Sequence, residues 1–582
     1  MIFLFEITID GVKTQVSENT TILTAAKNIG IKIPSLCNLK LDDYFFNNHA
    51  TCRICVVEVD KRDGLYPACS TICWNGMNVV TNSSQIIQIR KNILELLISN
   101  HPKDCLICSK SGECELQKLT QEFRLKEIRF SGERNQFKSE YSESIIRDPE
   151  KCIMCRRCET MCNKVQTCGV LSAINKGFHS VASTVYGNNL DKTVCTFCGQ
   201  CVSVCPVGAL HERNYIWEVI EALADPNKKV IAQVAPAVRV ALGEEFGMDV
   251  GLNVEKKIVT ALKKMGFDGV FDTTWAADLT IMEEATELKE RLEGYLSGDK
   301  TIKLPILTSC CPAWVNFIEY NFPNLLDIPS TSKSPQQMFS AIAKNVWAPK
   351  MGIDRKNLVV VSIMPCLAKK YEASRTEFIK DGNRDTDISI STRELADMIK
   401  YFNIDFKEVI DQEFDSPMGE YTGAGIIFGR TGGVLEAALR TAYEWVVGEE
   451  LKDIDFLKLE ISKGLIVKKV NFGPKELTIG IAHGLGNARK LLEEIESGKE
   501  IYHAIEIMAC HYGCVGGGGQ PFVHENIDIL NKRVEALNDI DKNCKLRKSH
   551  ENPYINNLYN EYFDFPCSEK AKILLHTRFF KK

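Results

Sequence analysis

Five cysteines in the second half of the chain lie in three short segments, TSCCP, MPC and MACHYGC, which are far apart in the sequence. Thiolates from such distant segments cannot form a local zinc finger, but they can hold a large metal cluster at the bottom of a cleft. Seventeen of the 24 cysteines precede residue 206, in spacings typical of iron-sulfur proteins. The first half therefore indicates electron transfer, and the later set indicates where the electrons are used. The later cysteines are Cys310, Cys311, Cys366, Cys510 and Cys514.

The first cysteine group has the spacing C-x14-C-x2-C-x13-C and predicts a [2Fe-2S] cluster. It differs from the C-x4-C-x2-C spacing of plant-type ferredoxins but keeps the central CxxC and the distant fourth cysteine. In this it resembles the [2Fe-2S] domain at the front of complex I. A group of buried apolar cysteines is the alternative, and Cys73 is interpreted as one such core residue. The predicted ligands are Cys37, Cys52, Cys55 and Cys69.

The segment HPKDCLICSKSGEC offers one imidazole and three thiolates for a single metal site. A neutral histidine in place of a thiolate removes negative charge, which should raise the reduction potential of a [4Fe-4S] cluster. A tetrahedral zinc ion could use the same four ligands. The neighbouring cluster motifs favour iron-sulfur over zinc. The candidate ligands are His101, Cys105, Cys108 and Cys114.

Residues 152–205 contain the pattern C-x2-C-x2-C-x3-C twice, the second time followed by Pro206. In ferredoxins with two [4Fe-4S] clusters, the fourth cysteine of each run binds the other cluster. Cys168 lies outside the pattern and receives no role. The predicted sets are Cys152, Cys155, Cys158 and Cys205 for one cluster, and Cys195, Cys198, Cys201 and Cys162 for the other.

The elements that must position these residues indicate a multidomain protein with α+β and α/β parts. FEITIDG, VKTQV and TILTAAKNIG read as two strands and a helix of a small ferredoxin-like sheet. In the second half, VIAQVAPAV and LVVVSIMPC read as buried strands and EEATELKERLEGYL as an amphipathic helix, so we expect an α/β unit with its site at the strand ends. The expected domains are a [2Fe-2S] ferredoxin-like domain at 1–85, a small [4Fe-4S] domain with one histidine and three cysteine ligands at 86–130, a two-[4Fe-4S] ferredoxin domain at 131–215 and a catalytic domain at 216–582.

Composition excludes several classes of protein. At 582 residues the chain can bury a large catalytic core, and its formal charge of -5 gives no polybasic signature for nucleic acid or anionic membrane. No stretch has the roughly 18 uninterrupted apolar residues of a membrane span, and no secretion signal is evident. Without GxGxxG or Walker A sequences, a built-in nucleotide site is unsupported. Many cysteines without a signal peptide predict reduced metal ligands in an anaerobic cytoplasm.

The late cysteine segments together resemble those of [FeFe]-hydrogenases, and the whole chain is similar to the clostridial monomeric type, through to RKSHENPYINNLYNEYF. The resemblance implies an H-cluster, which is a [4Fe-4S] cluster joined to a two-iron subsite with CO, cyanide and azadithiolate ligands, besides one [2Fe-2S] and three accessory [4Fe-4S] clusters. It implies that Cys514 bridges to the two-iron subsite. The implied ligands of the [4Fe-4S] part are Cys311, Cys366, Cys510 and Cys514.

The resemblance also implies an environment for the two-iron subsite. Lys369 stands out, because its ammonium can donate a hydrogen bond to a negatively charged cyanide ligand. Simple core packing is an equally good explanation for the methionines and the phenylalanine. The remaining residues of this environment are Ala235, Pro236, Gln336, Met364, Phe428 and Met508.

A proton route is implied as well, beginning at Cys310, which is not a ligand but the first relay beside the azadithiolate amine. The segment IMEEATELKER places Glu284, Glu287 and Arg291 at i, i+3 and i+7, on one face of a helix. A lone Glu on a helix is usually a solvated residue, and only the motif context favours a relay. Glu283 is left as a structural or surface residue. The implied order is Cys310, a water, Glu284, Ser330, Glu287 and Arg291.

Three positions depart from the clostridial pattern: Ala237 and Ala368 stand where serine is common, and Tyr512 replaces a glycine. Each changes a side chain expected near the cofactor. They put catalytic bias, inhibitor response and oxygen tolerance in doubt. The reaction itself is not in doubt, because every ligand and relay position is filled.

The implied activity is that of a ferredoxin hydrogenase, which reversibly converts protons and electrons to H2, with a ferredoxin or similar redox protein as partner. Maturation proteins are implied too, because the polypeptide alone cannot supply the two-iron subsite. An electron-transfer subunit like the front of complex I is the first alternative, although such a relay has no use for the late cysteine segments. A hydrogen sensor is the second, although no sensory domain is evident and Cys310 is retained.

Overall fold

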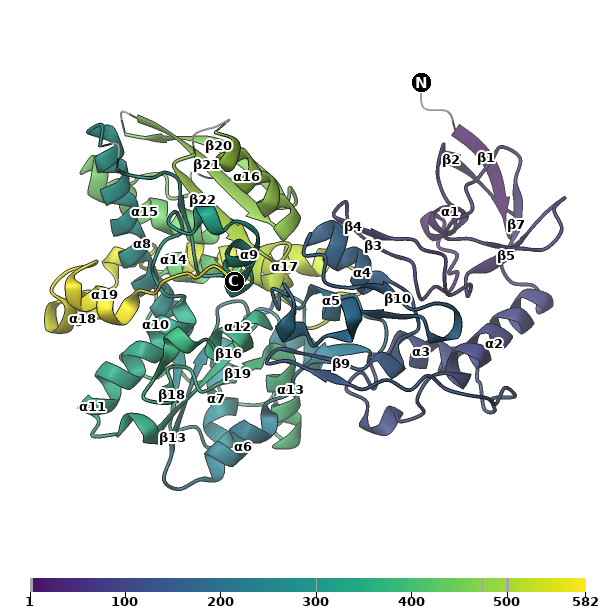
Figure 1. Ribbon diagram of the computed structural model, residues 1–582, viewed down its shortest axis with the longest axis horizontal. Helices are drawn as coiled ribbons and strands as arrows, with labels where there is room; N and C mark the ends of the chain where they lie inside the picture. Colours follow the sequence, from purple (N-terminus) through teal and green to yellow (C-terminus); the bar gives the residue numbers. More distant parts are fainter. Residues whose placement is uncertain (1–3, 300, 456, 458, 474, 499–501) are drawn as a thin grey trace. The chain divides into compact units, whose positions relative to one another are not determined.

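The computed structural model describes residues 4–299, 301–455, 457, 459–473, 475–498 and 502–582. The chain forms two compact units (Figure 1). The first unit consists of Met1–Lys164, Gly169–Thr193 and Cys201–His211. The second consists of Val165–Cys168, Val194–Gln200 and Glu212–Lys582, so two short segments from the ferredoxin-like region belong to it.

The first unit opens with a five-stranded sheet in the order β2-β1-β7-β5-β6. Helix α1 (Ile22–Asn28) is capped at its N-terminus by Thr21, whose side chain accepts a hydrogen bond from the amide of Thr24. Alternate residues of β1 face a core that also holds Ala25 and Ala26 of this helix. The predicted ferredoxin-like fold with one packed helix is confirmed. The strands are β1 (Leu4–Ile9), β2 (Val12–Ser17), β5 (Val56–Val59), β6 (Leu65–Pro67) and β7 (Asn78–Val80).

The rest of the first unit consists of short elements joined by loops. Buried ion pairs hold them: the Arg157 guanidinium donates to both oxygens of Glu115, at 2.6 and 2.9 Å, and to the carbonyl of Asn38. The helices are α2 (Ser84–Ser99), α3 (Glu115–Glu122) and α4 (Arg157–Thr160). The strands are β3 (Leu39–Leu41), β4 (Phe45–Asn47), β8 (Glu140–Tyr141), β9 (Ile145–Arg147), β10 (Ser172–Ile174) and β11 (Val181–Ser183).

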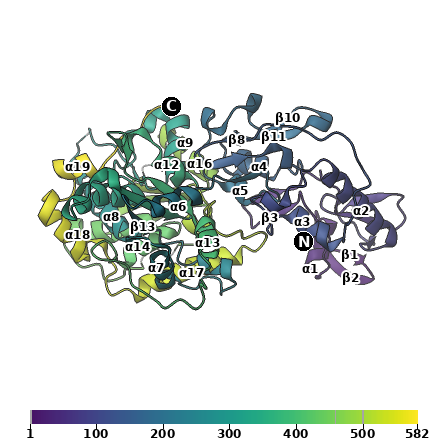
Figure 2. The same ribbon diagram turned by 90° about the horizontal axis from the view of Figure 1, so that it is seen from below.

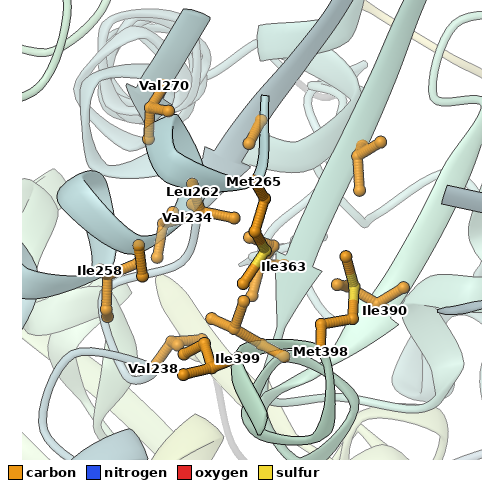
Figure 3. Close-up of a cluster of buried hydrophobic side chains, with 14 of the residues drawn as sticks. Val234, Val238, Ile258, Leu262, Met265, Val270, Ile363, Ile390, Met398 and Ile399 are labelled. Atoms are coloured by element: carbon orange, nitrogen blue, oxygen red, sulfur yellow. The ribbon is translucent and has the colours of Figure 1, made fainter. Parts of the chain in front are cut away.

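The second unit contains two four-stranded sheets, and the first has the order β14-β13-β16-β19 with every pair parallel. Its strands are buried on both faces: Val230, Ala232 and Val234 of β13 enter one core, and Ile231 enters another. The first of these cores also contains side chains of α7 and α13 (Figure 3). The elements are β13 (Lys229–Val234), β14 (Gly269–Asp272), β16 (Leu358–Met364), β19 (Ile388–Ser391), α7 (Glu255–Met265) and α13 (Thr392–Tyr401).

The second sheet has the order β15-β22-β21-β20, with β15, β22 and β21 parallel and β20 antiparallel at the edge. Residues of β21, β22 and α15 share one core. The predicted α/β architecture is confirmed. The elements are β15 (Ile306–Leu307), β20 (Leu465–Phe472), β21 (Lys475–His483), β22 (Ala504–Met508), α15 (Gly433–Val447) and α16 (Leu485–Ser497).

Helix α8 (Thr273–Leu296) packs into the cores of both sheets. Ala277, Ile281 and Ala285 lie in the core of the second sheet, whereas Trp275 and Leu279 lie in that of the first. Asp272 caps the N-terminus of the helix, because its carboxylate accepts a hydrogen bond from the amide of Thr274. The predicted helix over 283–296 starts ten residues too late, because a helix buried on two sides lacks the one-sided pattern that sequence reading relies on.

The C-terminal helices α18 and α19 lie close to α8 in both views (Figures 1 and 2). They bring the end of the chain to the acidic residues of α8. The other helices of the second unit are α6 (Ile216–Ala224), α9 (Pro312–Asn321), α10 (Pro335–Ile342), α11 (Ala348–Lys350), α12 (Ala368–Ala373), α14 (Gly423–Ile426), α17 (Asp528–Asn543), α18 (Pro553–Leu558) and α19 (Glu569–Leu575).

Candidate functional site

A cavity in the second unit lies where parallel strands of both sheets end. Beyond β13 the chain continues into Ala235 and Pro236, beyond β16 into Cys366, and beyond β22 into Cys510. The carboxyl ends of parallel strands are the usual place for a site in an α/β sheet. All five late cysteines line the cavity, as does every residue that the sequence predicted around the two-iron subsite. These lining residues are Ala235, Pro236, Cys310, Cys311, Gln336, Met364, Cys366, Lys369, Phe428, Met508, Cys510 and Cys514.

The cysteines reach the cavity from positions close to strand ends and helix starts. Cys311 immediately precedes Pro312, the first residue of α9, and Cys514 lies in a short 3-10 helix (Gly513–Gly516). Gly513 has φ +85°, and a Cβ there would lie 2.6 Å from the amide nitrogen of Thr431. Glycine is therefore required at this point of the C-x3-C loop.

Tyr512 also has a left-handed backbone, with φ +64°, where a glycine would be unstrained. Its amide donates to Nδ1 of buried His483 at 2.8 Å, which stabilises the loop in this conformation. The Tyr512 ring packs in a hydrophobic cluster that also contains Ala237 and Val515. Of the three positions that depart from the clostridial pattern, Ala237 lines the cavity, whereas Tyr512 and Ala368 do not.

The cavity thiols lie in surroundings that disfavour a negative charge. Burial raises the pKa of Cys311 and Cys510, and that of Cys514 to about 12. Thiolates bound to iron would have their charge compensated by the metal, so this set of donors fits an iron-sulfur cluster. The described cysteines form no disulfides, which leaves the thiols available for metal.

Lys369 supplies the positive charge of the cavity. Its ammonium donates to the carbonyl of Cys310 at 3.1 Å and to Glu372 at 2.9 Å. Burial acts to lower the pKa of Lys369, but Glu372 together with Cys310 and Cys366 outweighs it, and the pKa is raised. Glu372 also accepts from Ser334 and Gln336, which fixes its orientation. Glu372 was not predicted from the sequence, although its spacing of three residues from Lys369 on a helix was a usable signal.

The predicted proton-route residues lie along α8, in the loop after β15 and in the segment between α9 and α10. Glu284 is 2% exposed, and its Oε1 accepts from the Ser309 amide at 3.3 Å. Burial raises the pKa of Glu284 to about 8, and its Oε2 has no hydrogen-bond partner within the described residues. Ser330 is buried nearby, and its hydroxyl slightly counteracts this rise in pKa. Glu284 can therefore hold a proton near neutral pH.

Glu287 differs from Glu284, because its charge is compensated. Its oxygens accept from the amide and hydroxyl of Thr331, and His576 Nδ1 lies 3.4 Å from Oε1. Burial acts to raise the pKa of Glu287, but these partners outweigh it and the pKa is lowered. Arg291 donates to the carbonyl of Ile328 at 2.7 Å and contributes only longer-range attraction to Glu287.

Glu283, interpreted from the sequence as a structural or surface residue, is completely buried. It accepts hydrogen bonds from the Tyr559 hydroxyl, from the Cys567 amide at 2.7 Å and from His576 Nε2 at 2.9 Å. It is therefore structural and joins α8 to the C-terminal segment. These partners lie more than 270 residues away in the sequence, so no local pattern could reveal them.

The predicted [2Fe-2S] ligands converge in the first unit. The thiol of Cys37 is hydrogen-bonded to those of Cys52 and Cys69, and the thiol of Cys55 is hydrogen-bonded to that of Cys69. All four are buried, and Cys73 lies in the hydrophobic core. Their arrangement fits a cluster of four thiolates.

His101 has the geometry of a metal ligand. Its Nδ1 donates to the carbonyl of Pro102 at 2.8 Å, while its buried Nε2 has no hydrogen-bond partner within the described residues. A metal-binding histidine usually donates a hydrogen bond from the ring nitrogen that does not bind the metal, and this bond fixes the tautomer. After burial, Cys108 and Cys105 both contribute to the raised pKa of Cys114, so the three thiols lie near one another.

The first ferredoxin set is also brought together. Cys155, Cys205 and Cys152 all raise the pKa of Cys158 by their negative charge, after burial. Cys205, the fourth cysteine of the second run, thus lies with the first run, as the crossed pattern predicts. The other set is divided between the units, with Cys162 and Cys201 in the first and Cys195 and Cys198 in the second, and remains a prediction.

No helix within the described part of the chain is long and apolar enough to span a bilayer.

Family models match most of the chain. The model described as "Iron only hydrogenase large subunit, C-terminal domain" matches residues 228–518, and "Iron hydrogenase small subunit" matches residues 527–582. In the first half, a "2Fe-2S iron-sulfur cluster binding domain" matches 4–84, an "NADH-ubiquinone oxidoreductase-G iron-sulfur binding region" matches 90–129 and a "4Fe-4S binding domain" matches 189–211. The match at 90–129 favours iron-sulfur over zinc at the motif with one histidine and three cysteines.

Similar proteins span the whole chain. An NADP-reducing hydrogenase subunit, HndD, from Solidesulfovibrio fructosivorans is 56% identical over 100% of this chain and 99% of that protein. Iron hydrogenase 1 from Clostridium pasteurianum is 39% identical over 99% of this chain and 100% of that protein. A solved structure of apo [FeFe]-hydrogenase HydA1 from Chlamydomonas reinhardtii is 39% identical, with a TM-score of 0.57, and covers 63% of this chain and 99% of that chain.

Proposed function

The chain belongs to the iron-only hydrogenase family, and we propose that it catalyses the reversible reduction of protons to H2 at an H-cluster in the cavity of the second unit. The observation that carries this proposal is the convergence of five cysteines and Lys369 at the strand ends of two sheets. When bound, the two-iron subsite supplies the chemistry of hydrogen cleavage and formation. The polypeptide must hold this group, exclude water and move protons and electrons.

In this proposal Cys311, Cys366, Cys510 and Cys514 would hold the [4Fe-4S] part of the H-cluster, and Cys514 would also hold the two-iron subsite. The largely apolar cavity wall excludes water from it. Lys369 uses two of its N–H groups on Cys310 and Glu372, and a third can donate to a cyanide ligand. Glu372 keeps that ammonium oriented.

Protons move between the cavity and the surface along α8. The buried Cys310 thiol has a pKa raised by burial and by the nearby Glu284, so it stays protonated and can pass a proton on. Glu284, protonated near neutral pH, exchanges protons with Cys310 through a water, and Ser330 connects it with the ionised Glu287. Arg291 stabilises the charge of Glu287. The two carboxyl groups therefore differ in proton affinity: Glu284 holds a proton, and the ionised Glu287 accepts one.

Electrons reach the cavity through one [2Fe-2S] and three [4Fe-4S] clusters, bound by the sets predicted from the sequence. The external partner is a ferredoxin or a similar redox protein, as in the clostridial type. The NADP-reducing relative favours a second candidate, in which the chain is one subunit of an assembly that exchanges electrons with NADP through another subunit. Maturation proteins supply the two-iron subsite.

Hydrogen–deuterium exchange tests the proposal without any electron partner. The matured protein is placed under D2 in H2O buffer, and HD and H2 are followed by mass spectrometry. The proposal predicts steady formation of both gases. An electron-transfer subunit would form neither, and absence of exchange in protein with a full iron complement would refute the proposed reaction.

A further inference from the structure

The outer end of the proposed proton route poses a chemical problem. Arg291 is the last residue implied by the family pattern, yet a guanidinium remains protonated in proteins and cannot pass a proton on. Its donors are directed at backbone carbonyls, chiefly that of Ile328. Another group must accept protons from solvent and deliver them to Glu287.

Thr331 and His576 contact Glu287 directly. The Thr331 hydroxyl donates to Glu287 Oε1 at 2.5 Å and lies 2.7 Å from His576 Nδ1. A hydroxyl has one proton to donate, so His576 Nδ1 must donate to Thr331. His576 Nε2 lies 2.9 Å from the Glu283 carboxylate and donates to it. Both ring nitrogens therefore carry hydrogen, and His576 is an imidazolium.

We infer that His576 and Thr331 form the outer end of the proton route, with His576 passing protons through the Thr331 hydroxyl to Glu287. In the inward direction the Nδ1–H proton moves to the Thr331 oxygen, the hydroxyl proton moves to Glu287, and neutral His576 takes a new proton from water. Hydrogen oxidation reverses each transfer. This inference rests on the proposed function.

The surroundings keep this relay charged, with the His576 side chain only 6% exposed. Burial acts to lower the pKa of His576, but Glu283 and Glu287 outweigh it and raise the pKa to about 9. Besides these carboxylates of α8, the groups around His576 are Thr331 and the Tyr559 and Cys567 partners of Glu283. Thr331 is exposed, which connects the relay to solvent.

Glu283, Cys567 and His576 also offer potential metal-ligand atoms within 4.8 Å of one another. Both Glu283 oxygens, however, already accept hydrogen bonds from protein donors. The hydrogen-bonded relay accounts for the cluster without an ion.

The test uses the matured full-length protein with three variants. His576→Ala removes the ring, His576→Gln keeps hydrogen bonding but cannot titrate, and Thr331→Val removes the hydroxyl at nearly constant volume. Arg578→Ala, an exposed neighbour on the same segment, is the matched control. Turnover in hydrogen evolution, its pH profile and D2 exchange are measured, with iron content as a check on folding.

We expect about a tenfold or greater loss of turnover in all three variants and none in the control. The rate of hydrogen evolution by the wild-type protein should decline as pH rises through about 9, where His576 loses its proton. This decline should be absent from the pH profile of His576→Gln. Added imidazole should restore turnover in His576→Ala but not in His576→Gln.

Wild-type turnover and pH profile in both histidine variants, or a loss in His576→Ala that imidazole does not restore, would overturn the inference. Loss of the clusters in both histidine variants would assign His576 a structural role instead, and would overturn it too. If the wild-type protein itself shows no D2 exchange, the failure is that of the proposed function. If the wild-type protein shows D2 exchange and the variants are unaffected, only the relay is rejected and the proposed function stands.

Discussion

The two halves of the chain present cysteines to metal in different ways. In the first unit the candidate ligands of the histidine motif come from one short run, HPKDCLICSKSGEC, carried by loops between small elements. In the second unit the candidate ligands come from three distant segments, and two sheets bring them to one cavity. A candidate accessory-cluster site of this kind is therefore local in the sequence, whereas the candidate catalytic site depends on the fold of a whole unit. Substitutions should reveal this difference.

The largest effect is expected for Cys310→Ala in the catalytic half. The thiol is the proposed proton donor next to the cofactor, so its loss should reduce turnover by about 10²–10⁴-fold while iron content stays unchanged. Turnover with a reduced viologen dye and iron analysis measure both quantities. Cys73→Ala, a core cysteine of the first unit, is the matched control and should retain turnover. Wild-type turnover in the Cys310 variant would eliminate it as a relay.

In the first half the spacing of the cysteines alone was enough to predict local ligand sets, which stay predictions. The late cysteines were identified too, through their resemblance to a family. The residues that support them were missed: Glu372 orients Lys369, and His576 contacts Glu287. His576 contacts α8 only through the tertiary fold, and no periodicity in the sequence reports such a contact.

Gly513→Ala should have the next largest effect, because the fold of the catalytic half controls the ligand loop. A Cβ there meets the Thr431 backbone at 2.6 Å and sits at φ +85°, so the loop must move. We expect a cost of about 1–3 kcal/mol and reduced loading of the H-cluster, measured by iron content and turnover. Gly266→Ala, also at positive φ but with open space around its Cβ, is the control for backbone strain alone. Equal loading in the two variants would argue against a special role for the loop.

A smaller and more selective effect is expected for His101→Ala in the first half. His101 offers a buried Nε2 that has no hydrogen-bond partner among the described residues, so loss of this side chain should slow electron exchange with an external donor. D2 exchange should remain at the wild-type rate, because it needs no external electrons. Parallel assays with a protein donor and under D2 separate the two steps. Unchanged rates with the protein donor would remove this cluster from the electron path.

The smallest effect is expected on protein stability. It arises from the interaction of His576 with Glu283 and Glu287 in the second unit. The pKa of His576 rises from 6.5 to about 9 on folding, so its contribution is fully present below pH 6.5 and is lost as pH rises through about 9. We expect the apparent melting temperature of the wild-type protein to fall by several degrees across this window. The fall should be smaller in His576→Gln, and equal falls would show that other groups cause it.

The central claim is that the cavity of the second unit holds an H-cluster, and infrared spectroscopy of the matured protein tests it most directly. We predict bands from metal-bound CO and cyanide in the wild-type protein. The same bands should persist in Cys105→Ala, which alters only the first half, and should be lost in Cys514→Ala. Absence of these bands from wild-type protein after competent maturation would contradict the account and leave a chain that only relays electrons.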